Sequence, residues 1–377
     1  MGRPRRATWA MIAGGGTAGH VLPALAVGRA LVARGHAAGS IGFVGSSRGI
    51  EARLVPAAGF EITLLPGRGV ARRLSVSSGL AILGIVRAAV RALALLARRR
   101  PRVVLVVGGY ASVPCALAAF MLRVPMVVHE QNAVPGLANR LAARFARVSA
   151  TSFEGTPLPR AVTTGNPVRA EVAAVDRSPA GRAAAREALG VPAGRMVVAV
   201  FGGSLGARRI NEAARGMAEA WAARADLTVY HVVGTRDWGS FVPPAAPPEA
   251  GGALVYRAVE YEERMPLLLT AADVAVCRAG GSSVAELAAV GLPAVFVPLP
   301  IAPHDHQTAN ASALVAAGAA VLVPDGELTP ERLVAEVGPL LDDASVRQAM
   351  EVAGRALARP GAADEVASLM ERHARAG

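Results

Sequence analysis

Short aliphatic runs alternate with alanine-rich stretches along the whole chain, and this alternation constrains the fold more than any other feature. The aliphatic runs have the length of strands, and the stretches between them have the length and composition of helices. Strands that read as continuous aliphatic runs are typical of parallel sheets buried on both faces. The predicted fold class is therefore α/β, with doubly wound, Rossmann-like sheets. The predicted strands are residues 8–13, 40–44, 62–65, 102–107, 126–129, 147–151, 196–201, 228–233, 253–257, 273–277, 294–297 and 320–323.

A break in this pattern divides the chain into two halves. The stretch Gly165–Arg169 (GNPVR) interrupts it, and a charged stretch with the periodicity of a surface helix, Ser178–Gly194, follows. With 377 residues the chain is also too long for one ordinary core. We predict an N-terminal domain over residues 1–166, a C-terminal domain over 167–350, and a helical segment over 351–377 that packs back towards the N-terminal domain.

Each half contains the same feature twice, an aliphatic strand that runs into a glycine-rich turn. The four turns lie in AMIAGGGTAGH (10–20), VVLVVGGYAS (103–112), VVAVFGGSLGA (197–207) and ADVAVCRAGGSS (272–283). A glycine turn between a strand and a helix lets backbone N–H groups approach a phosphate, and the helix N-terminus adds partial positive charge. Because ligands of doubly wound sheets bind beyond the carboxyl ends of the strands, these turns predict a ligand-binding cleft between two domains.

The charge of the chain suggests an anionic partner. The formal net charge is +12, and none of the 40 basic residues is a lysine. Nucleic acid, phospholipid and a pyrophosphate substrate are candidate partners, whereas the arginine and alanine drift of a GC-rich genome would explain the same excess. A nucleic-acid binder needs a basic stripe with stacking aromatics, and only 4% of the residues are aromatic. We therefore expect no nucleic-acid partner.

Neither a membrane-spanning helix nor a cysteine framework is predicted. The most hydrophobic helix-length stretch, Leu80–Ala97, is interrupted by Arg87 and Arg91, whereas a spanning helix needs about 20 largely uncharged residues. The basic N-terminus leads into a short apolar run that reads as the first strand rather than a signal peptide. Cys115 and Cys277 lie in apolar surroundings and form no CxxC pair, so we predict two buried thiols without a disulfide or a zinc site.

The first glycine turn is followed by a candidate catalytic residue. A dinucleotide-binding dehydrogenase would carry an acidic residue at the end of the second strand, and here that strand runs into Gly45–Ser47. His20 follows the turn directly at the predicted start of a helix. An imidazole there can accept a proton from a sugar hydroxyl. The alternative is a histidine that is hydrogen-bonded to a neighbouring loop.

Four consecutive polar residues, His129–Asn132 (HEQN), follow another buried strand. Polar groups at such a place are costly unless they find hydrogen-bond partners. A polyhydroxylated substrate would supply partners, and so would a loop that braces the next helix. Both interpretations remain open from the sequence.

The most informative single region is CRAGGSSVAELAAVGLP (277–293). Here Gly280–Gly281 turn the chain after a strand, and Ser282 and Ser283 stand at a predicted helix N-terminus that can hold a diphosphate. Glu286 lies three residues after Ser283, one helical turn deeper, where a carboxylate can accept both hydroxyls of a ribose. The alternative is a capping box, in which Ser283 and Glu286 satisfy each other's backbone.

A second polar run follows the strand at 294–297. It comprises His304 and the stretch Asp305–Asn310 (DHQTAN). His304 and His306 could suggest a metal site, but the sequence around them contains no further His/Cys cluster and no DxD pair. We expect the run to form hydrogen bonds with a sugar and a pyrophosphate, and we expect no metal.

These motifs together resemble the MurG family, the glycosyltransferases that complete lipid II in peptidoglycan synthesis. The matching stretches follow the family's order over residues 8–325, with two small departures at Ala18 (often Gly) and Leu205 (often Gln). They are GGTAGH (15–20), GGYAS (108–112), HEQN (129–132), GNPVR (165–169), GGSLGA (202–207), CRAGGSSVAE (277–286) and DHQTAN (305–310).

The resemblance implies a GT-B fold, with UDP-N-acetylglucosamine bound mainly by the C-terminal domain and the acceptor mainly by the N-terminal one. It implies one-step, inverting transfer to the 4-hydroxyl of N-acetylmuramic acid in lipid I, with His20 or Glu130 as base and no cofactor. Glu262 is a further candidate, through its backbone, for contact with the uracil. The residues implied to contact the donor are Thr17, Ala18, Gly19, Asn132, Arg169, Ser204, Gly281, Ser282, Ser283, Glu286 and Gln307.

Peripheral attachment to the anionic, cytoplasmic face of the cell membrane is also expected, with other cell-wall synthesis proteins as further partners. Arginines alternate with aliphatic residues between Gly67 and Pro101, and each basic residue near an anionic leaflet contributes about 1 kcal/mol. The loop at 67–84, with Arg72 and Arg73, is the predicted lipid contact, whereas Leu93–Leu96 are expected to pack on the sheet.

Three other functions fit parts of the sequence. A transferase of the same fold could act on another lipid or on a small-molecule acceptor, although HEQN and GGYAS argue against it. A UDP-N-acetylglucosamine epimerase on a similar double fold would need acid–base carboxylates. The third, a nucleic-acid binder, is disfavoured by the scarcity of aromatic residues.

Overall fold

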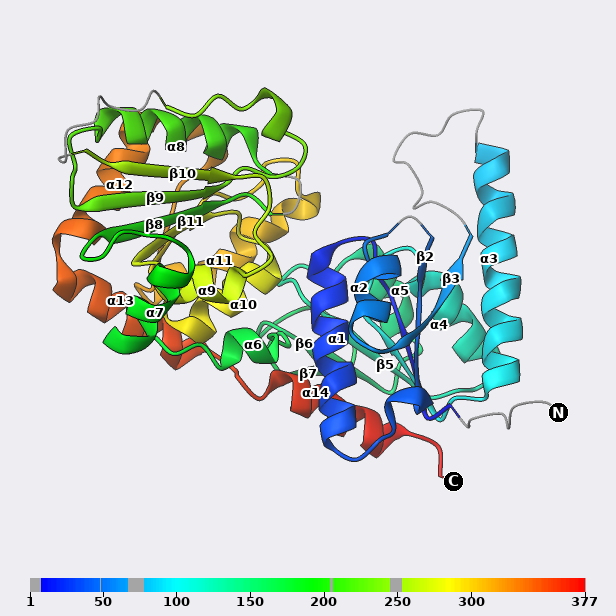
Figure 1. Ribbon diagram of the computed structural model, residues 1–377. Coiled ribbons are helices and arrows are strands. Elements are labelled where there is room, and N and C mark those ends of the chain that lie inside the picture. The colour runs from blue at the N-terminus through cyan, green and yellow to red at the C-terminus, as the bar shows by residue number, and fades with distance from the viewer. Residues whose placement is uncertain (1–7, 48, 67–77, 204–205, 245–252, 377) are drawn as a thin grey trace. The chain divides into compact units, whose positions relative to one another are not determined.

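The computed structural model describes residues 8–47, 49–66, 78–203, 206–244 and 253–376, with the side chains of 78–85 and 303 left outside the description (Figure 1). The chain forms two compact units, each with its own parallel sheet. Unit 1 comprises residues 1–169 and 359–377, and unit 2 comprises residues 170–358. The chain thus passes between the units after Arg169 and again after Ala358, where the sequence analysis had placed the boundaries at 166/167 and 350/351.

Unit 1 is built on a seven-stranded sheet of order β3-β2-β1-β4-β5-β6-β7, in which every pair of neighbours is parallel. The central strands β1 and β4 are buried along their whole length, which is why they read as uninterrupted apolar runs, AMIA and VVLV. The strands are β1 (Ala10–Ala13), β2 (Ile41–Ser46), β3 (Glu61–Leu65), β4 (Val103–Val106), β5 (Met126–Glu130), β6 (Val148–Thr151) and β7 (Ala161–Thr163).

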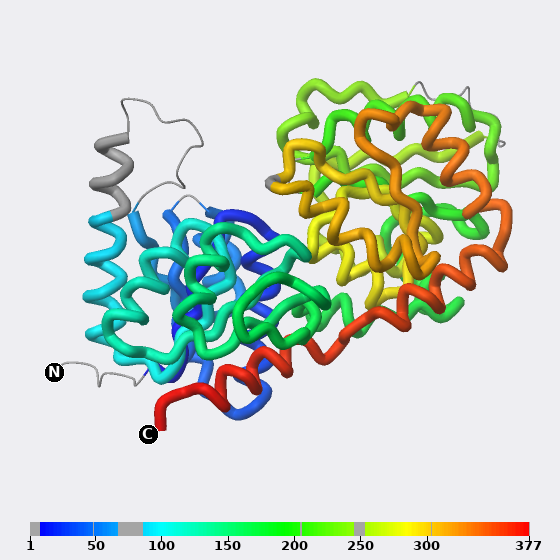
Figure 2. The backbone as a smooth tube through the Cα atoms, turned by 180° about the vertical axis from the view of Figure 1, so that it is seen from behind, coloured from blue at the N-terminus to red at the C-terminus, as the bar shows by residue number. Residues whose placement is uncertain are grey.

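Helices cover both faces of this sheet and bury one apolar cluster on each. Residues of α1 and α14 join one cluster, and residues of α3 and α4 join the other. Helix α14 comes from the end of the chain and packs against α1 (Figure 2). The helices of unit 1 are α1 (Ala18–Ala33), α2 (Glu51–Ala57), α3 (Ser78–Arg99), α4 (Ser112–Met121), α5 (Leu137–Ala143) and α14 (Ala362–His373), with a 3-10 turn at Ala38–Ser40.

Unit 2 repeats the plan with a six-stranded parallel sheet of order β10-β9-β8-β11-β12-β13. Its strands are β8 (Met196–Phe201), β9 (Leu227–Val232), β10 (Val255–Val259), β11 (Val274–Cys277), β12 (Ala294–Phe296) and β13 (Ala320–Leu322). Its helices are α6 (Ala170–Ala173), α7 (Pro179–Ala188), α8 (Arg208–Ala220), α9 (Met265–Ala271), α10 (Gly281–Val290), α11 (His306–Ala316), α12 (Pro330–Asp342) and α13 (Ala344–Leu357). Short 3-10 turns lie at Trp238–Ser240, Pro303–Asp305 and Asp325–Glu327.

The structure confirms the α/β fold class and the twelve predicted strands, each to within two residues at either end. The sequence analysis missed β7, because three residues with exposed or half-exposed side chains carry no aliphatic run. The predicted surface helix after Ser178 is α7, and Ser178 is its N-cap. No helix among the described residues is both long and apolar enough to span a bilayer.

The strand order in each sheet reverses at one point, between β1 and β4 in unit 1 and between β8 and β11 in unit 2. All four glycine-rich turns follow these four strands. The carboxyl ends of strands at such a switch point are where doubly wound sheets bind their ligands. Each unit therefore offers one site in a position that its topology favours.

Candidate active site

In unit 1, the turn between β1 and α1 presents His20 at the start of a helix. Helix α1 begins at Ala18 with Thr17 as its N-cap, and the Thr17 side chain makes no capping bond. The Thr17 hydroxyl instead lies 3.1 Å from Nδ1 of His20. Thr17 is exposed, and Ala18, Gly19 and His20 are half-buried, so a ligand can reach all four residues.

The second glycine turn, after β4, packs directly on the first. A Cβ atom at Gly109 would lie 2.2 Å from the carbonyl oxygen of Gly15, so only glycine permits this backbone approach. A Cβ at Gly108 would lie 3.0 Å from the imidazole of His20. The buried Ser112 hydroxyl lies within hydrogen-bond distance of the carbonyls of both turns, at 3.0 Å from Ala13 and 2.8 Å from Gly108. The two turns thus form one rigid surface beneath His20.

His129 and Gln131 of the HEQN stretch form a buried polar network behind that surface. The imidazole of His129 is fully buried, and burial lowers its pKa to about 4, with a smaller contribution from the charge of His20. Gln131 donates from its amide nitrogen to the carbonyl of Val107 and lies 3.1 Å from Nδ1 of His129. These two side chains support the strand ends rather than face a ligand.

Glu130 is buried and surrounded by N–H donors. Its Oε1 accepts from the backbone and side-chain nitrogens of Asn132 at 3.0 and 3.1 Å. Its Oε2 accepts from the backbone of Gly136 at 3.0 Å and from the amide of Asn139 at 2.9 Å. Four donors on two oxygens hold the β5–α5 loop, and they hold the half-buried Asn132 in its place.

In unit 2, the turn after β11 leads into α10 and places three candidate residues on its first two turns. The helix begins at Gly281, and its N-cap is Gly280, which makes no side-chain cap bond. The capping-box interpretation of Ser283 and Glu286 is therefore wrong, since that motif requires the serine to be the N-cap and the glutamate to lie three residues later. Ser282, Ser283 and Glu286 are half-buried and within reach of a ligand.

Arg278, which sequence reasoning had not singled out, clamps the strand ends below α10. Its guanidinium donates to the carbonyls of Val297 and Pro298 at 3.0 Å and to the carboxylate of Asp325 at 2.6 Å. One side chain thus connects the ends of β11, β12 and β13. Nothing in the local sequence reveals this, because the partners lie 19 to 47 residues away.

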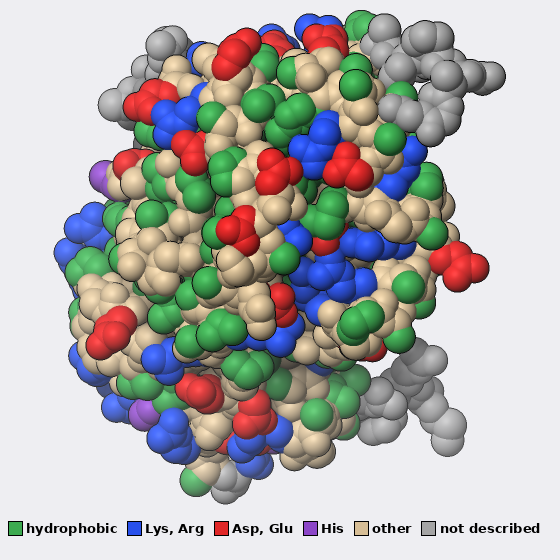
Figure 3. Space-filling view, turned by 90° about the vertical axis from the view of Figure 1, so that its left-hand side faces the viewer, with side chains coloured by type: hydrophobic (Ala, Val, Ile, Leu, Met, Phe, Trp, Pro, Cys, Tyr) green, Lys and Arg blue, Asp and Glu red, His purple; other side chains and the backbone are tan. Residues whose placement is uncertain are grey.

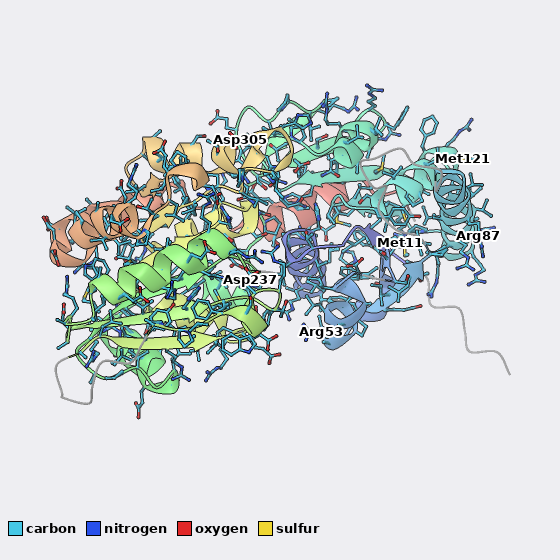
Figure 4. The ribbon with its side chains drawn as sticks, turned by 90° about the horizontal axis from the view of Figure 1, so that it is seen from above. Met11, Arg53, Arg87, Met121, Asp237 and Asp305 are labelled. Atoms are coloured by element: carbon cyan, nitrogen blue, oxygen red, sulfur yellow. The ribbon has the colours of Figure 1, made fainter. Side chains whose placement is uncertain are left out.

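The DHQTAN stretch forms the start of α11 and the loop before it. His304 and Asp305 have φ angles of 55° and 50°, left-handed values that are uncommon for residues other than glycine. Gln307 accepts the backbone N–H of Leu299 at 2.9 Å, and the fully buried Asn310 donates to the carbonyl of Ala279 at 3.1 Å. Asn310 thereby joins α11 to the turn that precedes α10. Figure 4 labels Asp305 in this loop.

Three remaining candidates have different surroundings. Arg169 is half-buried and is the last residue of unit 1 before the chain crosses. Ser204 lies outside the described residues, as does Leu205. Glu262 is buried and accepts from the hydroxyl of Tyr230 at 2.5 Å and from the backbone of Arg264 at 2.8 Å, so its carboxylate has a structural role.

The described residues contain no group of three or more His, Cys, Asp or Glu side chains that could hold a metal ion. Both cysteines are buried and free, as the sequence analysis predicted. The face in Figure 3 shows acidic and basic side chains interspersed over its surface.

Known proteins match the chain over nearly its whole length. Residues 10–151 match the glycosyltransferase family 28 N-terminal domain, and residues 197–366 match the family 28 C-terminal domain. A relative from Nocardioides sp. is 45% identical over 359 residues, which cover 94% of this chain and 95% of the relative. A relative from Desulforudis audaxviator is 38% identical over 97% of this chain and 99% of its own. Both are named UDP-N-acetylglucosamine–N-acetylmuramyl-(pentapeptide) pyrophosphoryl-undecaprenol N-acetylglucosamine transferase.

A solved structure agrees. The crystal structure of MurG from Acinetobacter baumannii superimposes with a TM-score of 0.75 at 30% identity, covering 97% of this chain and 99% of that one. Two family domains in the expected order, relatives above 30% identity over the full length, and a shared two-sheet fold lead to one assignment. The chain belongs to glycosyltransferase family 28.

Proposed function

We propose that this enzyme transfers N-acetylglucosamine from UDP-N-acetylglucosamine to the 4-hydroxyl of N-acetylmuramic acid in lipid I, with inversion at the anomeric carbon. The observation that carries the proposal is the name shared by relatives at 38% and 45% identity, which align along nearly the whole chain. The product, lipid II, would feed peptidoglycan synthesis, so cell shape and cell division would depend on the reaction.

Donor binding is assigned to unit 2. The diphosphate rests at the N-terminus of α10, where Ser282, Ser283 and the backbone of Gly281 supply donors and the helix supplies partial positive charge. The carboxylate of Glu286, one turn along the same helix, accepts the ribose hydroxyls. Gln307 reaches the sugar from the start of α11. Ser204 and Arg169 contact the nucleotide sugar as well, as do Thr17–Gly19 and Asn132.

His20 is the proposed base. The imidazole is half-buried above Gly108, and its Nδ1 lies 3.1 Å from the hydroxyl of Thr17. An imidazole at this place can take the proton of the attacking hydroxyl as the new bond forms. Glu130 is the weaker candidate, because all of its described bonds hold the β5–α5 loop. The negative charge that develops on the departing UDP is stabilised by the N-terminus of α10.

The test of this function is UDP release. The enzyme is mixed with UDP-N-acetylglucosamine with and without a lipid I analogue, and UDP is measured by a coupled assay. We expect release that depends on the acceptor and that falls on the order of a hundredfold or more in His20→Ala. The control is His373→Ala, a histidine on α14 outside the site. UDP release without acceptor, or His20→Ala turnover equal to that of the control, would refute the assignment.

Glu286→Gln tests the donor site separately. Loss of a charged acceptor at the ribose should weaken UDP binding by about 1.5–3 kcal/mol, roughly 10- to 150-fold in Kd. The matched control is Glu336→Gln on α12, whose carboxylate pairs with Arg332 at the surface. Titration calorimetry with UDP measures both variants, and equal affinities would rule out Glu286 as the ribose contact.

The proposed membrane contact is a patch on α4, α5 and the residues just after α5, which we call the α4–α5 patch: Leu117, Phe120, Met121, Leu141 and Phe145. All five side chains are at least 41% exposed, and the rings of Phe120 and Phe145 lie 4.4 Å apart. Exposed apolar side chains that form one patch mark interaction sites. The exposed arginines Arg123, Arg140 and Arg144 flank the patch.

Helix α3 lies beside α4 and extends the same surface (Figure 4, where Arg87 and Met121 are labelled). Val86, Arg87, Val90 and Arg91 are exposed on α3, whereas Leu95 and Leu96 pack into the core, as the sequence analysis expected. The predicted lipid contact at Arg72 and Arg73 lies outside the described residues. Basic and apolar side chains on one surface suit the anionic, cytoplasmic face of the cell membrane, where other cell-wall synthesis proteins would also be encountered.

Vesicle cosedimentation tests the membrane proposal. Phe120→Glu should lower the fraction bound to vesicles of anionic phospholipid, whereas Val352→Glu, at an exposed valine on α13, should not. Equal binding of the two variants would remove the α4–α5 patch from this role.

A further inference from the structure

We propose that Glu51 is a positioning residue for His20, acting through the backbone of the β1–α1 turn. The proposal rests on the proposed function, because the role of His20 as base belongs to it. Neither the motifs nor the comparisons with known proteins draw attention to this glutamate, which lies outside every glycine-rich stretch.

The carboxylate of Glu51 connects the turns that follow two neighbouring strands. Glu51 is the first residue of α2, and its side chain is only 2% exposed. Its Oε2 accepts the backbone N–H of Gly16 at 2.8 Å, and its Oε1 accepts the backbone N–H of Ser46, the last residue of β2, also at 2.8 Å. Bonds from amides to an ionised carboxylate are among the stronger hydrogen bonds of proteins.

Three glycines from three segments make room for this side chain. A Cβ atom would lie 2.3 Å from the carboxylate at Gly15, 2.4 Å from Cγ of Glu51 at Gly45, and 2.0 Å from Oε2 at Gly49. Gly45 does not have a left-handed φ angle, so space alone explains why it is a glycine. The Glu51 side chain therefore occupies space that is available only because these three residues are glycines.

The other surroundings of the side chain are apolar. A small cavity of about 10 Å³ borders it, lined largely by Ile12, Val21, Val44 and Val55. Burying a carboxylate among apolar groups is costly, and an apolar residue of similar volume is often at least as stabilising. A carboxyl group in these surroundings suggests a role beyond packing.

That role follows from the position of Gly16, whose backbone N–H donates to Oε2 of Glu51. Gly16 precedes Thr17, whose hydroxyl lies 3.1 Å from Nδ1 of His20 and whose carbonyl accepts the backbone N–H of His20 at 3.1 Å. Fixing Gly16 therefore fixes the N-cap of α1 and, through it, the orientation of the imidazole. The Gly16 N–H also points to a carboxylate of the chain itself, so this turn suits a neutral sugar hydroxyl better than a substrate phosphate.

A kinetic double-mutant cycle tests the proposal. Glu51→Gln keeps the volume but turns an NH2 group towards one of the two N–H donors. We expect it to lower kcat by about 10- to 100-fold, the range that a small misplacement of a reacting group produces. The KM for UDP-N-acetylglucosamine should change by a smaller factor than kcat does, because the proposed diphosphate and ribose contacts of the donor lie on α10 in unit 2. In a His20→Ala background the same substitution should change kcat by less than about twofold, because residues that act as a unit are not additive.

The outcomes separate the two claims. If His20→Ala alone keeps a near-normal kcat, the proposed base is wrong. If His20→Ala loses activity, and adding Glu51→Gln lowers kcat again by the same factor as in the wild-type background, only the inference about Glu51 is wrong. The matched control is Asp273→Asn, another buried carboxylate, which lies in unit 2 just before β11. It accepts the N–H of Val197 at 2.6 Å and pairs with Arg182 and Arg186, at the ends of β8 and β11 away from the glycine-rich turns. It should leave kcat per folded molecule unchanged.

A stability cycle keeps the proposal testable if the glutamate variants fold poorly. Gly45→Ala should lower the melting temperature in the wild-type background and lower it less together with Glu51→Ala, which removes Cγ and Oε1, the two nearest atoms that the new methyl meets, and leaves Cδ1 of Ile62 at 3.2 Å. Gly326→Ala, where a Cβ meets open space, is the control. Equal effects of Gly45→Ala in both backgrounds would show that the turn is not built around Glu51.

Discussion

The choice between His20 and Glu130 as base can be decided by one substitution, Glu130→Gln. The carboxylate accepts four N–H donors on two oxygens. A glutamine side chain has one oxygen, which can still accept from two of the N–H donors. Its NH2 group would face the other two donors, so two hydrogen bonds are lost. Hydrogen bonds to a charged group contribute about 1.5–3 kcal/mol each, so the expected loss in the free energy of unfolding is roughly 3–6 kcal/mol.

Glu130→Gln should therefore lose stability rather than catalysis. Urea unfolding followed by circular dichroism should show the lower stability, and turnover per folded molecule, measured where the variant is still folded, should fall far less than in His20→Ala. Asn139→Ala, which removes one of the four donors, is the matched variant and should lose a smaller part of the stability. A Glu130→Gln enzyme as stable as the wild type but without turnover would refute the reasoning and make Glu130 the base.

Three further predictions concern buried groups. Burial lowers the pKa of His129 to about 4, whereas the unfolded chain binds a proton below about pH 6.5. The unfolded state thus holds more protons between these values, so the free energy of unfolding should fall by about 3 kcal/mol as the pH drops from 6.5 to 4. The substitution His129→Asn should make this dependence on pH smaller, as measured by urea unfolding at several pH values. Burial raises the pKa of Cys115 to about 12 and also raises that of Cys277, so a thiol reagent followed by mass spectrometry should label neither until its own unit opens. Asn310→Ala should cost about 1–3 kcal/mol of stability by leaving a buried carbonyl unpaired, and calorimetry should show weaker UDP binding.

The sequence was enough to predict the two sheets and the position of each glycine turn. Buried parallel strands need aliphatic residues along their whole length, so the strand pattern is written locally. The turns could be predicted because a close backbone approach, such as that of Gly109 to Gly15, admits only glycine. The start of α10 at Gly281, with its two serines, could be predicted for the same reason.

The residues that the sequence analysis missed act through partners far along the chain. Glu51 reaches Gly16 over 35 positions, and Arg278 reaches Asp325 over 47. No local periodicity records such pairs, and a single glutamate or arginine in a helix-like stretch reads as a surface residue. The capping-box alternative for Ser283 is wrong because the N-cap of α10 is Gly280, which has no side chain.

The central claim is the transfer itself, and the structure of the product tests it most directly. The enzyme is incubated with UDP-N-acetylglucosamine labelled with 13C at the anomeric carbon and with a lipid I analogue, and the product is examined by NMR. Because the sugar is α-linked in the donor, inverting transfer predicts the label in a β-linkage to the 4-hydroxyl of N-acetylmuramic acid. Label in an α-linkage, on another hydroxyl, or only in a free or epimerised sugar would contradict the account.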